Sequence, residues 1–485
     1  MSNNKMNSSK IKNKLFINNE YILPKNNLFF ENTNPANENF ICQIPQSSIE
    51  DIELAVQAAH KAFNGPWKNF TPFEKGQLLF KFSDIIEKNA KYLSFLESLD
   101  VGKPKSEAEG DINGVINCFR YNAGAADKIE GATIPLGSEF VDYTELVPLG
   151  VTAHIVPWNF PLGMAARSLA PALAAGCTVV LKPAEQSSLS AIALGDLIKE
   201  AGFPEGVINI VTGYGEQAGS MLVNHPLVKG ITFTGSVETG KIIYENAAKG
   251  IKPVVLELGG KNPMIVFPDA NISKAVDDAI DASFGNSGQV CSSSSRLFLH
   301  EDISEEFLKE FEDKALKLTV GPPEENPNLG PLASEEQYDK VMSYINQGIK
   351  DGSKLRFGGT RPNRFSKGYY VMPTLFENVD MTTKLAKDEI FGPVAIVHKF
   401  KKEEEAIEMA NAYDTGLVAG IYTENISRSL TLSRKLDFGS VWINGWFIGG
   451  LQAPTGGVKM SGIGRERGMP GIHNYLYIKN IGVHL

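Results

Sequence analysis

The sequence predicts an α/β protein with a parallel sheet in each of two large domains and a small β arm. Between Val151 and Leu258, short apolar runs alternate with segments whose apolar residues recur every three or four positions. That alternation is typical of βαβ units, which build a parallel sheet with helices on both faces. A second series of apolar runs and helical patterns begins near Met264. With 485 residues, of which 42% are hydrophobic, the chain can supply about three domain-sized units with large cores.

The elements follow from these patterns in chain order. Three amphipathic segments upstream predict helices that cover the first sheet, at 50–62, 72–89 and 105–126. Five apolar runs predict its strands, at 151–156, 178–181, 207–211, 230–233 and 253–258, with helices between them at 163–175, 188–201 and 215–223. The second series predicts helices at 272–284, 304–318 and 335–348, and strands that include 394–398 and 440–443.

Two further segments fit neither sheet, because they alternate in the manner of exposed strands. They are residues 131–147 and 474–484. Two separate pieces of this kind can pair into an arm that docks on another subunit. A plain surface hairpin is the alternative.

Composition and charge exclude several classes of protein. The net charge is −9 and no run of five Lys or Arg residues occurs, which disfavours nucleic-acid binding. No apolar stretch reaches 18 residues, so we expect no membrane span. The seven histidines form no pair at metal-ligand spacing, so we expect no metal. The first 19 residues contain no acid, and we expect a solvated tail there rather than a transit peptide.

Four cysteines stand far apart in the chain, at Cys42, Cys118, Cys177 and Cys291. They form no Cys-x-x-Cys pair, so we expect neither a disulfide framework nor a zinc site, and a reducing, cytoplasmic location. Cys177 lies in an apolar stretch and is interpreted as a small core residue. Cys291 differs, because small and polar residues surround it, as in an accessible and reactive thiol.

A glycine-bounded turn at 231–242 follows one predicted strand and opens a helix. Such a turn points backbone N–H groups and the positive end of a helix at an anion. The turn nearly matches a P-loop, but Ile242 stands where a P-loop needs a hydroxyl for Mg²⁺, which disfavours an NTPase. A tight turn that uses glycine only for backbone reasons is a third explanation.

A lone nucleophilic cysteine needs a base and a group that holds an oxyanion. Glu257 supplies a carboxylate at the end of one predicted strand, and Asn159 an amide just after another. Ligands bind at such strand ends in parallel sheets. Spacing alone leaves open whether Glu257 and Asn159 instead serve as turn or cap residues.

Seven blocks in the same order resemble the NAD(P)-dependent aldehyde dehydrogenase superfamily from about Phe16 onward. They are PWNFP at 157–161, LKPAE at 181–185, FTGS at 233–236 with Gly240, LELGGK at 256–261, GQVC at 288–291, EIFGP at 389–393 and SGIGRE at 461–466. One block is weak evidence, whereas seven in sequence are specific. The resemblance implies the hydrolytic, non-acylating type, because Glu257 is retained where CoA-acylating members usually replace it.

The resemblance also implies a role for each catalytic residue. Cys291 would add to an aldehyde, Asn159 would hold the oxyanion, and Glu257 would activate the water that hydrolyses the thioester. Glu466 would relay protons to Glu257, and an ion pair with Arg465 is the alternative. The implied cofactor-binding residues are Trp158, Lys182, Glu185, Gly235, Ser236, Gly240, Leu258, Glu389 and Phe391.

The resemblance implies a division of the chain. Residues 1–127 and 149–257 would bind the dinucleotide, 258–460 would form the catalytic domain, and 128–148 with 472–485 would form an oligomerisation arm of a homodimer or homotetramer. We expect NAD rather than NADP, because the carboxylate of Glu185 repels a 2′-phosphate, although Lys182 beside it would tolerate one.

The substrate is less sharply indicated. Arg167 stands where betaine-aldehyde members tend to carry Trp, which disfavours a quaternary ammonium substrate. It could instead pair with the carboxylate of a semialdehyde, or form a salt bridge within the protein. Gly285 stands where succinic-semialdehyde members tend to have a second Arg. Trp446, Ile448 and Thr455 resemble the family's substrate-anchor loop, and a small to medium aldehyde is expected.

A non-catalytic nucleotide-binding protein of the same fold is the remote alternative. The joint presence of Cys291, Glu257 and Asn159 argues against it.

Overall fold

The first of two large sheets has eight strands, in the order β2-β1-β9-β8-β7-β10-β11-β21. The computed structural model describes residues 11–485. The five central strands run parallel and are almost wholly buried, as expected of apolar runs covered on both faces. The bounds are β1 Leu15–Ile17, β2 Glu20–Ile22, β7 Val151–Ile155, β8 Thr178–Lys182, β9 Ile208–Ile210, β10 Val228–Gly235, β11 Val254–Leu258 and β21 Gly462–Ile463.

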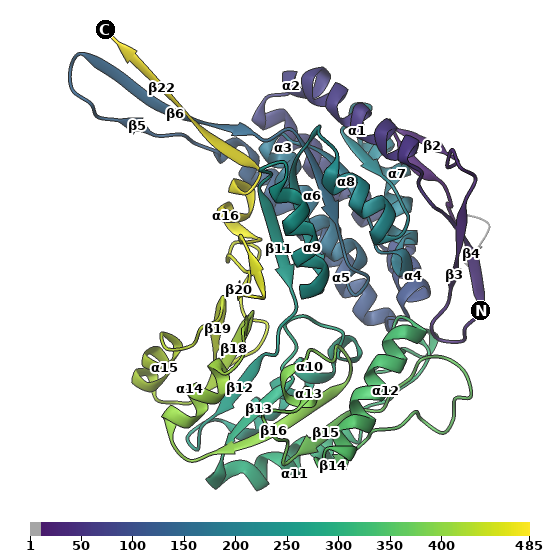
Figure 1. The fold of residues 1–485 in the computed structure, drawn as a ribbon, viewed down its shortest axis with the longest axis vertical. Helices are drawn as coiled ribbons and strands as arrows, with labels where there is room; N and C mark the ends of the chain where they lie inside the picture. Colours follow the sequence, from purple (N-terminus) through teal and green to yellow (C-terminus); the bar gives the residue numbers. More distant parts are fainter. Residues whose placement is uncertain (1–10) are drawn as a thin grey trace.

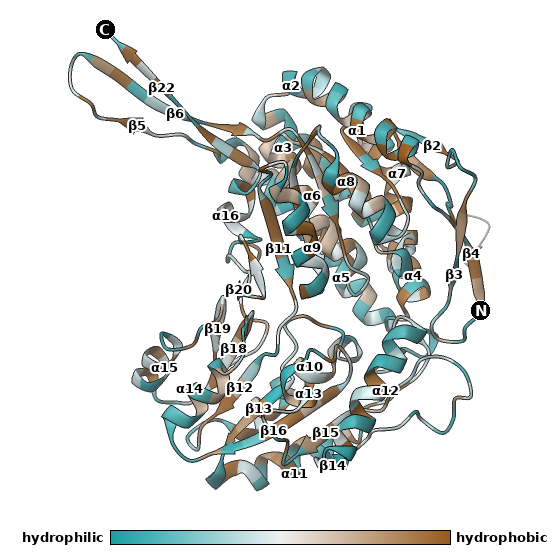
Figure 2. Ribbon diagram, viewed as in Figure 1, coloured by the Kyte–Doolittle hydropathy of each residue, from teal (hydrophilic) through white to brown (hydrophobic). Residues whose placement is uncertain are grey.

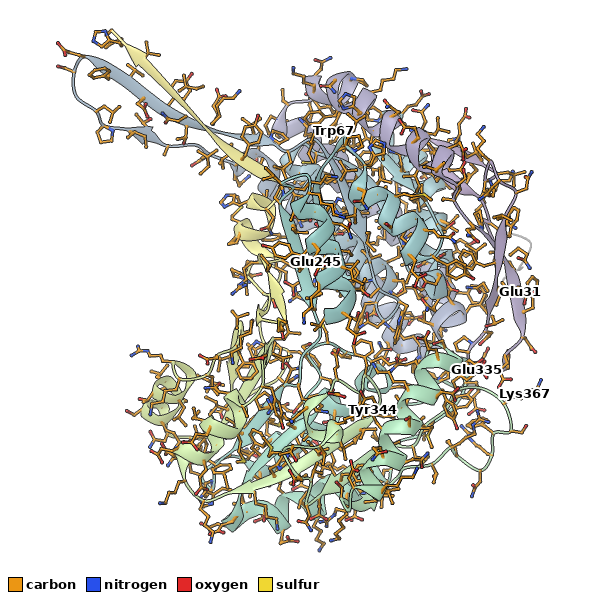
Figure 3. The ribbon with its side chains drawn as sticks, viewed as in Figure 1. Glu31, Trp67, Glu245, Glu335, Tyr344 and Lys367 are labelled. Carbon is orange, nitrogen blue, oxygen red and sulfur yellow. The ribbon has the colours of Figure 1, made fainter. Side chains whose placement is uncertain are left out.

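Helices cover both faces of this sheet (Figure 1). One layer consists of α3 Pro72–Lys88, α4 Ala90–Val101, α5 Lys105–Ala125, α6 Pro161–Ala175 and α7 Leu189–Ala201. The other consists of α1 Ile49–Asn64, α8 Ser220–Asn224 and α9 Val237–Ala248. Local sequence sets where these helices begin: Ser48 and Asp51 form a capping box for α1, and Thr71 and Glu74 form one for α3. Trp67 on α2 (Pro66–Asn69), labelled in Figure 3, is fully buried, and its Nε1 donates to the Cys177 carbonyl at 3.1 Å.

The second sheet has seven strands, in the order β14-β15-β16-β13-β12-β18-β19, and only β14 is antiparallel to its neighbour. The strands are β12 Pro263–Val266, β13 Arg296–His300, β14 Lys354–Phe357, β15 Thr374–Glu377, β16 Val394–Phe400, β18 Val418–Tyr422 and β19 Ser440–Ile443. Its helices include α10 Ile272–Phe284, α11 Ser304–Ala315, α12 Glu335–Lys350, α14 Glu403–Asn411 and α15 Ile426–Ser433. Figure 2 shows hydrophobic strands in the middle of both sheets and hydrophilic stretches on the peripheral helices.

The third part is a three-stranded antiparallel arm that projects from the body next to the first sheet (Figure 1). It consists of β5 Thr133–Ile134, β6 Phe140–Pro148 and β22 Leu476–His484, and β22 pairs with β6 along its whole length. The two strand-like segments singled out in the sequence therefore do pair. The arm leaves large apolar side chains exposed, among them Ile134, Phe140, Tyr477 and Ile478.

The predicted α/β fold class is confirmed, and most expected elements lie within a few residues of their predicted bounds. The expected helix at 215–223 is instead a π-type turn at Gly215–Gly219 followed by α8. The expectation of a solvated tail over residues 1–19 is wrong for Leu15–Ile17, because these residues form β1 and are buried against β9. The rest of that expectation falls largely on residues 1–10, outside the described residues.

A hairpin of β3 (Phe29–Thr33) and β4 (Phe40–Pro45) was not predicted. Within residues 11–485, no helix combines the length and the apolar character that crossing a membrane requires.

Candidate active site

A cavity lies where the C-terminal ends of β7, β10 and β11 face the second sheet's body. This is the edge of a parallel sheet at which ligands bind. The cavity brings together the three residues that the sequence singled out for chemistry, namely Cys291, Glu257 and Asn159. The other lining residues are Pro157, Trp158, Met164, Thr234, Gly235, Ser236, Leu258, Gly259, Gln337, Lys340, Glu389 and Phe391.

Cys291 lies in the loop between α10 and β13, and its side chain is half-buried. Asn262, at the start of the second sheet, donates from Nδ2 to the carbonyl oxygens of Cys291 and Ser293, both at 2.8 Å. Burial raises the pKa of the Cys291 thiol to about 11, and the positive charge of Arg167 opposes that rise only in part. The thiol is therefore protonated near neutral pH, and its use as a nucleophile requires a base in the same cavity.

Glu257 meets that requirement. It lies near the end of β11 with its side chain buried, and its Oε1 has no hydrogen-bond partner. Burial, and then the negative charge of Glu466, raises the pKa of Glu257 well above its usual value. A buried carboxylate with an unsatisfied oxygen and a raised pKa has the properties of a general base.

Asn159 follows β7 and precedes α6, and it is buried. One of its two amide hydrogens is used, because Nδ2 donates to the Gln289 carbonyl at 2.8 Å. That bond ties the amide to the segment that leads into Cys291. The second amide hydrogen remains for an oxygen atom bound in the cavity.

Glu466 is buried beside this group, and its ion-pair partner is Arg167 on α6. Arg465 does not pair with it, because its guanidinium donates to the carbonyls of Gly457 and Gly464 at 3.0 and 2.7 Å. The alternative of an Arg465–Glu466 ion pair is therefore wrong. Arg167 also donates to the Met164 sulfur at 3.3 Å. Its positive charge is already paired with the Glu466 carboxylate inside the protein.

The glycine-bounded turn forms the junction of β10 and α9. Ser236 is the N-cap of α9, and its Oγ accepts from the Thr239 N–H at 3.1 Å. Gly240 is buried one turn later, where a Cβ would lie 2.7 Å from the Leu258 side chain. Gly240 therefore permits α9 to pack on β11 and does not line the cavity, whereas Gly235, Ser236 and Leu258 do.

Lys182 ends β8, and Glu185 follows it at the same sheet edge. The Lys182 Nζ is buried and donates to the Pro183 carbonyl at 3.0 Å and to the Glu185 carboxylate at 3.4 Å. Glu185 is partly exposed. This internal pairing leaves Glu185 as the accessible charged group of the two, which suits hydroxyl groups rather than a phosphate.

Two aromatic rings and a carboxylate close the other side of the cavity. Trp158 and Phe391 make an edge-to-face contact with ring centroids 5.3 Å apart. Glu389 Oε1 accepts from the Gly260 N–H at 3.2 Å, and burial raises the pKa of Glu389 to about 7. A Cβ at Gly259 would lie 2.0 Å from Glu389 Oε2, so a larger residue there would displace the Glu389 carboxylate.

The predicted substrate residues Arg167, Trp446, Ile448 and Thr455 do not line this cavity. Trp446 is buried and donates from Nε1 to the Ser292 carbonyl at 3.0 Å, directly next to Cys291 in sequence. Thr455 pairs through its backbone with Glu466, at 2.7 and 2.9 Å. Ile448 is exposed. The structure thus connects Trp446 and Thr455 to the surroundings of the thiol and the carboxylates.

Sequence reasoning missed Met164, Gln337 and Lys340, which also line the cavity. Gln337 on α12 donates from Nε2 to the carbonyls of Ile390 and Phe391, at 3.1 and 2.7 Å. Tyr344, further along α12 and labelled in Figure 3, donates to Asp388 at 2.9 Å. No local signal marks these polar residues, since they resemble the solvent face of any amphipathic helix.

The donor set of the site suits organic ligands rather than a metal. Within the described residues 11–485, no group of three or more His, Cys, Asp or Glu side chains is arranged to hold a metal ion. The glycine turn, the aromatic pair and the half-buried Glu389 instead fit a nucleotide with hydroxyl-bearing sugars.

Comparison with known proteins agrees with this geometry. The aldehyde dehydrogenase family matches residues 22–481. An aldehyde dehydrogenase from Emericella nidulans is 44% identical over 97% of this chain and 95% of its own length, and human retinal dehydrogenase 2 is 44% identical over 97% and 92%.

Solved structures lead to the same family. A structure of a Bacillus cereus aldehyde dehydrogenase in complex with NAD⁺ superposes with a TM-score of 0.96, is 42% identical, and covers 98% of this chain and 97% of its own. A betaine aldehyde dehydrogenase from Staphylococcus aureus in complex with NAD⁺ is 36% identical, with a TM-score of 0.96 and coverage of 100% and 97%. The resemblance found in the seven sequence blocks is thereby confirmed, and this chain belongs to the aldehyde dehydrogenase family.

Proposed function

We propose that this chain is an NAD-dependent aldehyde dehydrogenase that oxidises an aldehyde to a carboxylic acid through a thioester on Cys291. The observation that carries the proposal is the convergence of Cys291, Glu257 and Asn159, from three separate segments, on one cavity that the glycine turn also lines. Family membership and the NAD⁺ complexes of related enzymes support it.

In this mechanism the thiol loses its proton to a base and Sγ adds to the carbonyl carbon of the aldehyde. The charge that develops on oxygen accepts hydrogen bonds from the free Asn159 amide hydrogen and the Cys291 backbone N–H. Bound NAD supplies the hydride acceptor. Loss of hydride from the carbon leaves a thioester on Cys291.

Glu257 then removes a proton from water, the resulting hydroxide adds to the thioester carbon, and the C–S bond breaks to release the carboxylic acid. The carboxylate of Glu257 suits this step because its Oε1 has no competing hydrogen bond. Glu466, whose charge raises the pKa of Glu257, would pass the proton onward.

For the cofactor, Gly235, Ser236 and Leu258 would form the cradle around the pyrophosphate side, with Gly240 allowing α9 to approach. Lys182 and Glu185 would face the adenosine ribose, Glu389 the nicotinamide ribose, and Trp158 and Phe391 the nicotinamide side of the cavity. The partly exposed carboxylate of Glu185 supports NAD over NADP.

For the substrate, the Arg167–Glu466 ion pair supports an uncharged aldehyde over a semialdehyde. A guanidinium already paired with a buried carboxylate would leave that carboxylate uncompensated if it turned to a substrate. The aromatic cluster of Trp442, Trp446 and Phe447 supports a partly apolar approach to the thiol. Ile448 and Thr455 would complete the substrate side of that approach.

A panel of short aliphatic, aromatic, aminated and carboxylated aldehydes, assayed by NADH absorbance, tests the activity and the substrate class together. Turnover of uncharged aldehydes that depends on Cys291 supports the proposal. A preference for carboxylated aldehydes that Arg167→Ala abolishes would establish the semialdehyde alternative. Mg²⁺-dependent ATP hydrolysis without NADH formation would overturn both.

We further propose a homodimer or homotetramer assembled through the arm formed by residues 128–148 and 472–485. Its exposed apolar side chains and the strand edges of β5 and β22 support such docking. We also propose the division into 1–127 with 149–257 and 258–460, which the presence of two separate sheets supports. Four free thiols support a cytoplasmic location. Light scattering of the full chain and of a variant with the β22 residues Tyr477 and Ile478 changed to Ser tests the assembly.

A further inference from the structure

Lys103 is a buried cation beneath the loop that carries Asn159. It lies between α4 and α5, and its side chain has no exposed surface. Gly102 before it adopts a left-handed φ of 74° and packs on Pro331, where a Cβ would lie 2.3 Å from the ring. Pro104 after it is the N-cap of α5. The connector is thus held on both sides, and the direction of the Lys103 side chain is fixed.

The ammonium group makes three contacts, and one is to the backbone of the proposed oxyanion residue. Nζ donates to the Asn159 carbonyl at 2.9 Å and forms an ion pair with Asp111. It also lies 3.9 Å from the centroid of the Phe160 ring. An ammonium has three N–H bonds to satisfy, and here two acceptors and an aromatic face surround it.

The Asn159 carbonyl accepts a second hydrogen bond, from Asn286 Nδ2 at 3.0 Å. Asn286 is held in turn, because its backbone N–H donates to Glu107 on α5 at 3.2 Å. The Asn159 side-chain amide reaches the Gln289 carbonyl in the same segment. Both ends of Asn159 are therefore fixed, the backbone by Lys103 and Asn286 and the side chain by the segment leading to Cys291.

The charges around Lys103 make its removal costly to this arrangement. Three carboxylates approach it from α4 and α5, namely Glu97, Glu107 and Asp111. Glu97 Oε1 accepts from the Leu162 N–H at 2.8 Å, which anchors the first turn of α6 directly after Asn159. Without the ammonium, these buried carboxylates would repel one another and the anchors of the loop would loosen.

We propose that Lys103 is a positioning residue that fixes the Asn159 carbonyl and thereby directs the free amide hydrogen of Asn159 at the oxyanion. The proposal rests on the role of Asn159 given above. Lys103 itself touches neither the thiol nor the cavity, so its effect passes through Asn159 and the segment around Asn286.

A double-mutant cycle of Lys103→Met and Asn159→Ala tests this coupling in the full-length enzyme. Lys103→Met is expected to lower kcat by about 10- to 100-fold with KM for NAD unchanged, and Asn159→Ala by about 10²- to 10³-fold. If Lys103 acts through Asn159, Lys103→Met costs less than about threefold in the Asn159→Ala background. Additive losses, or no loss from Lys103→Met alone, would overturn the proposal.

A matched control separates positioning from stability. Asp111→Asn breaks the same ion pair but leaves the bond from Lys103 to the Asn159 carbonyl, so it should lower the melting temperature while kcat changes by less than about threefold. An Asp111→Asn loss of kcat as large as that of Lys103→Met would overturn the proposal.

Two further outcomes are distinguishable. If Lys103→Met does not fold, as judged by circular dichroism, the cycle is run with Lys103→Gln, whose shorter side chain no longer reaches the carbonyl. If Asn159→Ala leaves kcat intact, the assigned role of Asn159 fails and this inference fails with it. If Asn159→Ala lowers kcat but the loss from Lys103→Met is additive with it, the role of Asn159 stands and only this inference is refuted.

Discussion

Gly456 offers a way to disturb the proposed general base without changing its chemistry. Its φ is +154°, and a Cβ added there would lie 2.6 Å from Glu257 Oε1. Because real Cβ contacts essentially never fall below 3.0 Å and ordinary contact begins at 3.4 Å, Gly456→Ala should push the carboxylate away by 0.4 to 0.8 Å, the differences from 2.6 Å. Misplacement on the order of 1 Å can cost about 10²-fold in rate, so we expect thioester hydrolysis to slow by about 10- to 100-fold.

Rapid mixing of the Gly456→Ala enzyme, NAD and an aldehyde would show which step of the reaction is slowed. The first turnover should form NADH faster than the steady state, because the thiol can lose its proton to Glu257 before mixing, whereas each hydrolysis needs the carboxylate placed beside the water. The control is Gly352→Ala, which has a left-handed φ of +85° but open space around the added Cβ. It should lose stability without a burst of NADH. Equal slowing of the first turnover and the steady state in Gly456→Ala would refute the reasoning.

Three shorter predictions concern the thiol, the cofactor and pH. Cys291→Ser should lower kcat by more than about 10³-fold with NAD binding retained, measured by NADH formation and by fluorescence titration of the cofactor. Glu185→Ser should raise kcat/KM for NADP relative to NAD by about tenfold, because it removes a like charge facing a 2′-phosphate; an unchanged ratio would place the 2′-position elsewhere. Glu466→Gln removes a negative charge that raises the pKa of Glu257 and releases Arg167, and both effects favour ionised Glu257. The acidic limb of kcat/KM should therefore move to lower pH, and a shift to higher pH would contradict the coupling.

Periodicity was enough to locate the central strands and most helices, because fully buried parallel strands and amphipathic helices leave strong local patterns. The strand β1 could not be found this way. Its three residues are buried because the strand packs into the first sheet, where Phe16 pairs with Ile210, far along the chain. A strand of three residues is too short to show an alternating pattern that would distinguish it from a tail.

The site shows the same division between local and distant causes. Cys291, Glu257 and Asn159 stood out through their immediate neighbours, and all three line one cavity. The ion-pair partner of Glu466 could not be found in this way, because Arg167 lies on α6, whereas the adjacent Arg465 donates to backbone carbonyls. Ion-pair partners depend on which elements the fold brings together, and sequence proximity is a poor guide to them.

The short connection from β11 to β12 has a consequence for motion between the two sheets. Glu257 is the penultimate residue of β11, and five residues later Asn262, directly before β12, donates to the Cys291 carbonyl at 2.8 Å. Gly260 on this connection also donates from its backbone N–H to Glu389 Oε1 at 3.2 Å. The carboxylate of Glu257, the Cys291 loop and the opposite wall of the cavity are thus all tied to one short segment, so a change in the angle between the sheets would carry these groups together rather than separate them.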